Sequence, residues 1–160
     1  MVDRSNKNEN KDFSVFPVGF IRRNTSEVTI EIIADFKSAL KGLEKFSHVQ
    51  ILWWFSKFED KESRETIQFH NMPFKAPRLG VFACRSPKRP NPIGLTTAKI
   101  LSIDNDKGLV KIANIDAYDN SPVLDLKPYL PSCDRVRTTL VPEWAAGWQD
   151  WLPEEGLSLE

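Results

Sequence analysis

Three prolines, Pro87, Pro90 and Pro92, lie close together and restrict the fold of this chain more than any other sequence feature. Proline fixes φ at about −65° and has no backbone N–H, so these residues cannot lie inside a helix or a central strand. The apolar run before them, Leu79–Cys84, predicts a strand in which Cys84 is a small buried hydrophobic residue. We therefore expect a strand that leads into a stiff, irregular loop.

The loop carries three cations, Arg85, Lys88 and Arg89, on a backbone with little conformational freedom. A planar guanidinium matches a carboxylate or a phosphate, so the loop suits an anionic ligand. No acidic residue occurs between Glu65 and Asp104, which makes this span locally basic. The candidate phosphate and RNA contacts in it are Lys75, Arg78, Lys88 and Arg89. The alternative is a surface loop whose charges are solvated or paired within the loop.

The composition is that of an ordinary globular domain: 160 residues, 41% apolar and 28% charged, with zero formal net charge. One domain is expected after a polar segment, residues 1–12, which we predict to be a disordered tail. That segment has no signal-peptide core and no apolar run could span a membrane, so a cytoplasmic location is expected. Two cysteines are too few for a disulfide scaffold or a zinc site, and no metal is expected.

Short apolar or alternating segments, with almost no helix between them, predict a mainly β domain, an antiparallel barrel or sandwich. One short helix is expected at Asp35–Lys45 and a hairpin turn at 105–108. No βαβ rhythm or glycine-rich turn after a strand occurs, so a Rossmann-type fold is disfavoured. The expected strands are Phe13–Arg22, Val28–Ile33, His48–Phe58, Leu79–Cys84, Thr96–Ile103, Leu109–Ile115 and Val123–Leu126.

Residues 135–160 have a different character, with tryptophans at helical spacing. Trp144, Trp148 and Trp151 fall on one face of a predicted helix that starts near Pro142. We expect this helical tail to pack on the barrel or on a partner subunit. The alternative is a platform on which RNA bases stack, although the acidic neighbours in this segment disfavour contact with phosphate.

Three blocks of the sequence resemble the signatures of the TsaA-like family, the tRNA methyltransferases of the TrmO type. They are Gly42–His48, the stretch from Arg85 to Gly94, and Asp116–Tyr129, in the family's order. The resemblance implies a small antiparallel β-barrel with minor helices, placed here at residues 13–134. It also implies that S-adenosylmethionine is the cofactor and is bound outside any Rossmann framework.

The resemblance further implies which residues contact the cofactor. Arg85 would fork to a carboxylate such as that of the methionine moiety, unless it forms a salt bridge within its loop. Asp116 would hold a ribose hydroxyl, and the backbone that follows would bind an adenine edge, although 119–122 is also an ordinary turn signature. Ser56 and Lys57 stand where some relatives carry His-Gln. The full cofactor set is Arg85, Ser86, Thr96, Asp116, Ala117, Tyr118, Asp119, Ser56 and Lys57.

Methyl transfer from a sulfonium needs alignment more than side-chain chemistry, so a binding constellation is expected rather than a catalytic triad. The weak candidates for a base are Asp119 and Asp125. The family's reaction is N6-methylation of N6-threonylcarbamoyladenosine beside the tRNA anticodon, by a homodimer. Two alternatives remain open at this point: a methyltransferase for another small substrate, and a non-catalytic barrel that binds a nucleotide or RNA.

Overall fold

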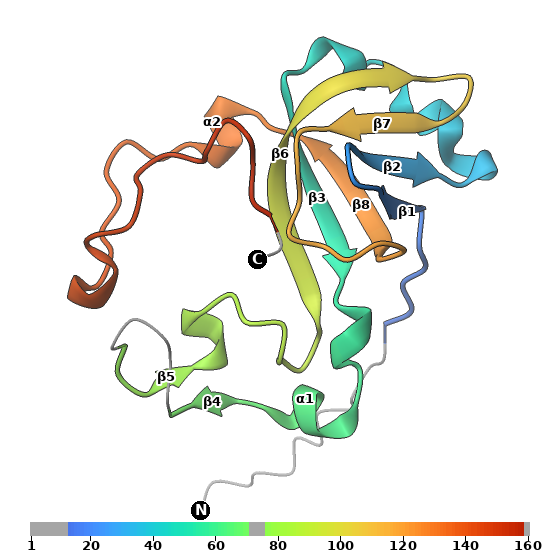
Figure 1. Ribbon diagram of the computed structural model, residues 1–160. Coiled ribbons are helices and arrows are strands. Elements are labelled where there is room, and N and C mark those ends of the chain that lie inside the picture. The colour runs from blue at the N-terminus through green and yellow to red at the C-terminus, as the bar shows by residue number, and fades with distance from the viewer. Residues whose placement is uncertain (1–12, 71–75, 159–160) are drawn as a thin grey trace, which may run out of the picture.

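The computed structural model describes residues 13–70 and 76–158, which form a closed antiparallel β-barrel with two segments that leave it (Figure 1). The strand order around the barrel is β1-β2-β7-β6-β3-β8. The predicted fold class is thereby confirmed, with the closed barrel realised rather than the sandwich. The strands are β1 (Gly19–Arg23), β2 (Val28–Ile32), β3 (His48–Trp54), β6 (Ile93–Asp104), β7 (Leu109–Ile112) and β8 (Pro122–Pro128).

The barrel interior is filled by β-branched side chains and one tryptophan. Alternate residues of β3 point inward, so Val49, Ile51 and Trp53 are buried while their neighbours are half-buried. Ile21 and Ile30 reach the same core from β1 and β2. The long strand β6 serves both sides of the barrel, because it pairs first with β3 and then with β7.

Within residues 13–70 and 76–158, helical structure is limited to short turns. The helix expected at Asp35–Lys45 is instead two 3₁₀ turns, η1 (Ala34–Leu40) and η2 (Leu43–Lys45). Gly42 separates them at φ +95°, a left-handed conformation that ends a regular helix. Further short elements are η3 (Ser56–Phe58), α1 (Lys61–Glu65) and α2 (Pro131–Asp134).

The chain leaves the barrel after β3 and re-enters it at β6 (Figure 1). This excursion carries α1 and a small two-stranded sheet, β4 (Gln68–Phe69) with β5 (Leu79–Gly80). The strand predicted at Leu79–Cys84 is therefore wrong beyond Gly80, because β4 offers only two residues to pair with. A 3₁₀ turn, η5 (Val81–Ala83), follows, and Cys84 lies after it, only partly buried.

The C-terminal segment also leaves the barrel, after β8 (Figure 1). The helix predicted from Pro142 is wrong, because only a 3₁₀ turn, η6 (Glu143–Ala145), forms there. Gly147 follows that turn and lowers helix propensity, and an isolated short helix is marginal in water. Trp144 and Trp148 still meet edge to face, with ring centroids 5.6 Å apart.

Two further findings concern the described residues alone. None of their helices is long and apolar enough to cross a membrane. They contain no group of three or more His, Cys, Asp or Glu side chains that could hold a metal ion. The predicted tail at residues 1–12 lies outside the described residues, and packing of the C-terminal segment on a partner stays a prediction.

Candidate functional site

A cavity of about 260 Å³ lies where β3 ends, between η3 and the loop that joins β7 to β8. Ser56 and Lys57 line it from one side, and Tyr118 and Asp119 line it from the other. These four residues were predicted as cofactor contacts from two distant parts of the sequence. The barrel brings them together, because β3 and β8 are paired neighbours and both segments flank those strands.

The cavity wall is aromatic and tightly packed. Trp53 and Phe55 line it, with ring centroids 4.3 Å apart, and Phe20 adds a third ring. The Trp53 ring lies directly on Gly94, where a Cβ atom would come within 2.4 Å of Cε2. The glycine of the proline loop is thus required by close packing rather than by a turn.

At the cavity, the Lys57 ammonium lies 3.4 Å from the centroid of the Tyr118 ring. This cation–π contact joins the two sides of the cavity. A lysine cation attracts a carboxylate or a phosphate, and aromatic faces stack on a purine. The lining can therefore hold a ligand that combines an anionic group with a flat ring.

Thr96 lies behind this wall and does not line the cavity. It is 1% exposed, accepts a hydrogen bond from Trp53 Nε1 (3.1 Å) and donates one to Asp116 Oδ1 (2.6 Å). The Thr96 hydroxyl has one proton, which it donates to Asp116. Thr96 therefore holds the Trp53 ring and does not face a ligand. Ala117 is also fully buried. Of the residues predicted in this block, only Tyr118 and Asp119 line the cavity.

The proline loop is held from inside by Arg89. Its guanidinium donates to the carbonyl oxygens of Ser86 (2.9 Å), Val81 (3.1 Å) and Cys84 (2.7 Å). Buried backbone carbonyls need such donors, and a guanidinium supplies five in a fixed fork. The guanidinium of Arg89, which was predicted to contact phosphate, therefore binds the backbone of its own loop.

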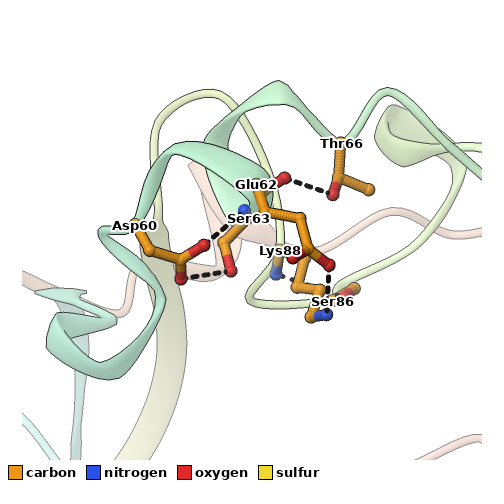
Figure 2. A network of polar contacts seen from close by, with 6 residues as sticks. All are labelled: Asp60, Glu62, Ser63, Thr66, Ser86 and Lys88. Carbon is orange, nitrogen blue, oxygen red and sulfur yellow. Dashed lines mark hydrogen bonds and ion pairs between the residues drawn. The ribbon is translucent and has the colours of Figure 1, made fainter.

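Helix α1 braces the outer side of the same loop (Figure 2). Lys88 Nζ lies 4.0 Å from Glu62 Oε1, and its backbone N–H donates to Ser86 Oγ at 3.3 Å. Arg64 Nε donates to the Pro90 carbonyl at 3.0 Å. The side chain of Asp60 caps α1.

Arg85 and Ser86 are not among the residues that line the cavity. Arg85 is exposed and donates to the carbonyl of Leu95, one residue before Thr96. It therefore contacts the backbone of β6 next to Thr96, whose side chain faces the interior. Arg78 donates to Gln68 Oε1, across the small β4–β5 sheet. Lys75 lies outside the described residues.

The two candidate bases occupy different places. Asp119 is at the cavity, where its Oδ1 accepts the backbone N–H of Arg23 at 2.8 Å. Asp125 lines a second cavity of about 350 Å³ beside η1 and η2, and it pairs with Lys127 at 2.6 Å. The hydrogen bond to Asp125 raises the pKa of Lys127. Asp125 is thus not part of the constellation around Lys57 and Tyr118.

Sequence reasoning missed the contribution of β1. Its last two residues, Arg22 and Arg23, reach the loop between β7 and β8. Asn120 in that loop has φ +63°, the left-handed conformation expected for an asparagine at this turn. The sequence offered one signal, two adjacent arginines at the end of a strand. This signal does not indicate which residues the arginines contact.

Comparison with known proteins identifies the family. Residues 10–135 match the family model described as the tRNA-methyltransferase O N-terminal domain, and the chain belongs to this family. A probable S-adenosyl-L-methionine-binding protein of Methanocaldococcus jannaschii is 37% identical over 123 residues, which cover 74% of this chain and 93% of that protein. The tRNA (adenine(37)-N6)-methyltransferase of Escherichia coli is 35% identical over 120 residues, or 74% of this chain and 51% of that enzyme.

A solved structure agrees with the fold. TrmO from Pseudomonas aeruginosa superposes with a TM-score of 0.64 at 30% sequence identity, over 81% of this chain and 61% of that one. The chain therefore spans nearly all of the archaeal relative but only about half to two thirds of these two bacterial proteins.

Proposed function

We propose that this chain is an S-adenosylmethionine-dependent methyltransferase that acts on an adenine N6 atom in tRNA. The observation that carries the proposal is the cavity that joins Ser56 and Lys57 to Tyr118 and Asp119. Family membership supports it, since one relative is named as a binder of this cofactor and another as a tRNA (adenine(37)-N6)-methyltransferase.

The cavity lining fits the chemistry of this cofactor. The Lys57 ammonium would attract its carboxylate, and the rings of Phe20 and Tyr118 would contact its adenine. We propose Arg85 and Ser86 as further contacts from the proline loop, with Thr96 and Asp116 acting from behind the Trp53 wall. When bound, the cofactor supplies an activated methyl group for in-line transfer to nitrogen.

Asp119 is the residue of this set that we propose as the base. Methylation forms a bond from carbon to N6, breaks the bond from carbon to sulfur and releases the N6 proton. A carboxylate at the cavity mouth would accept that proton. The proposed substrate is N6-threonylcarbamoyladenosine next to the anticodon, and a tRNA substrate agrees with the expected cytoplasmic location.

A homodimer is part of the proposal. The cavity, at about 260 Å³, is smaller than the roughly 300–1,000 Å³ of a ligand pocket, so a second copy would complete it. Both segments that leave the barrel carry exposed apolar side chains, among them Phe82 (91% exposed) and Leu140 (96%). Such side chains on projecting segments suit a partner surface. Arg78 and Lys88 would then contact tRNA phosphates.

Calorimetric titration with S-adenosylmethionine tests the proposal, using the parent, Lys57→Ala and the matched surface variant Lys107→Ala. We expect binding by the parent, a loss of at least about tenfold in Lys57→Ala and no change in Lys107→Ala. A methylation assay on tRNA that carries the threonylcarbamoyl group then tests the substrate. Binding without transfer to tRNA would favour another small substrate, and tRNA binding without cofactor binding would favour a non-catalytic RNA-binding barrel.

A further inference from the structure

Arg23, the last residue of β1, makes four contacts with one loop of the candidate site. Its Nε donates to the Ala117 carbonyl (3.3 Å), its Nη1 to Asn114 Oδ1 (3.2 Å) and its Nη2 to the Ile115 carbonyl. Its backbone N–H donates to Asp119 Oδ1 at 2.8 Å. All the acceptors are about ninety positions away in the sequence.

The loop needs these donors because of how it is folded. Between β7, which ends at Ile112, and β8, which begins at Pro122, the side chains of Ile115 and Ala117 are fully buried. Their carbonyl groups therefore point away from the core, to the half-buried guanidinium of Arg23. A guanidinium stays charged and offers several donors in one rigid plane, so a single side chain can hold several points of a loop.

The held residues directly precede the part of the loop that lines the cavity, which begins at Tyr118 and Asp119. Ala117 is followed by Tyr118, whose ring lies under the Lys57 ammonium, and then by Asp119. A shift of the carbonyls at 115 and 117 would move both side chains. We propose that Arg23 is a positioning residue, which fixes the loop of residues 114–119 so that Tyr118 and Asp119 face Lys57 across the cavity.

The neighbouring arginine provides a comparison. Arg22 also reaches the loop, through Nη1 to Asn120 Oδ1 at 2.6 Å, and it pairs with Glu31 at 2.6 Å. Both side chains of that ion pair are nearly half exposed, and exposed pairs contribute little. Arg22 is nevertheless no control for Arg23, because Asn120 lines the cavity and Arg22 Cζ lies 5.4 Å from the centroid of the Phe20 ring, which also lines it.

Hydrogen exchange of the ligand-free protein tests the geometric part. We expect Arg23→Ala to speed amide exchange within residues 113–121 while the barrel strands stay protected, and the surface variant Lys107→Ala to change it little. Arg23→Lys should give an intermediate result, because one ammonium cannot span three acceptors. Unchanged exchange of the loop in Arg23→Ala would overturn the inference. If that variant does not fold, the same measurement on Arg23→Lys decides, and an unchanged loop there overturns it.

Cofactor binding tests the functional part, which rests on the proposed function for the identity of the ligand. We expect the Kd for S-adenosylmethionine to rise at least about tenfold in Arg23→Ala and less than about twofold in the surface variant Lys107→Ala, and binding by Arg23→Ala to be partly restored by millimolar guanidinium ion. In turnover, the cofactor KM should rise more than kcat falls. No binding by the parent would refute the proposed function and leave the exchange result to decide on Arg23. Binding by the parent with an unchanged Kd in Arg23→Ala would overturn the positioning role.

Discussion

At the scale of single residues, the candidate site depends on side chains that do not face the ligand. Thr96 connects the indole of Trp53 to the carboxylate of Asp116, and it is buried behind the cavity wall. Gly94 leaves room for the same indole. The shape of the cavity wall therefore depends on residues that lie behind those lining the cavity.

Replacement of Thr96 by valine keeps the volume but removes both hydrogen bonds. We expect the free energy of unfolding to fall by about 1–3 kcal/mol, because the Trp53 N–H and the Asp116 carboxylate lose a buried partner. Urea denaturation measures this change. Thr97→Val, at the next position of β6, is the matched control and should change stability by less than about 0.5 kcal/mol. Equal effects of the two variants would contradict the role given to Thr96.

At the scale of elements, the proline loop is organised by Arg89 from within and by α1 from outside. Its cations therefore divide into Arg89, which is committed to three carbonyl groups of the loop, and Arg85 and Lys88, which contact the Leu95 carbonyl and Glu62 outside it. Two predictions follow this division.

The first concerns the salt dependence of tRNA binding. Lys88→Gln should lower the slope of log K against log salt by about one, because we propose that the Lys88 ammonium contacts one phosphate. Arg89→Gln should weaken binding without changing that slope, since its guanidinium is committed to the carbonyls of Val81, Cys84 and Ser86. Filter binding over a salt series measures both. A slope lowered by about one in Arg89→Gln would contradict this prediction and show that Arg89 contacts a phosphate.

The second concerns acid stability through the cap of α1. Hydrogen bonds from the hydroxyl and then the backbone N–H of Ser63 lower the pKa of Asp60. A group with a depressed folded-state pKa stabilises the fold above its ordinary value of about 3.9, and that contribution is lost as pH falls through the folded pKa. We expect Asp60→Asn to flatten the decline of Tm below about pH 4. Glu65→Gln, which removes an exposed pair with Lys61, is the control and should leave the decline in place.

The sequence predicted the barrel well because its signal is local. The strands predicted at His48–Phe58 and Leu109–Ile115 form as β3 and β7 but end earlier, at Trp54 and Ile112, and the turn predicted at 105–108 connects β6 to β7. The helix predicted from the tryptophan spacing was wrong, because a short helix is stable only where one of its faces packs on other structure. The prediction that Ser56, Lys57 and Tyr118 belong to one site came from a family resemblance. The role of Arg23 was not predictable, because backbone carbonyls are acceptors in every residue and give no sequence signal.

At the scale of the whole molecule, two segments project from a closed barrel (Figure 1). Both segments carry exposed apolar side chains. The proposed homodimer would use them. Phe82 lies on η5 in the first of these segments, close in sequence to the proline loop.

We expect Phe82→Asp to shift the protein from dimer to monomer and to weaken cofactor binding at least about tenfold, since a charge at a buried interface position is costly. Sedimentation velocity combined with calorimetry measures both effects. Val15→Asp, at an exposed apolar residue before β1, is the control and should change neither. A parent protein that is monomeric at all concentrations would refute the dimer.

Closure of the barrel also determines how this protein can associate at all. Each of its six strands has a neighbour on both sides, but β6 pairs with β7 only from Ile100 onward, and β8 pairs with β1 only through Pro122 and Val123. Residues 93–99 of β6 and 124–128 of β8 therefore have a partner among the described strands on one side only. The strands β4 and β5 also have free edges, but with two residues each they are too short to template an added strand. Elsewhere on the barrel, association must depend on side chains. Partner choice can accordingly change through surface substitutions while the backbone pairing of the barrel stays intact.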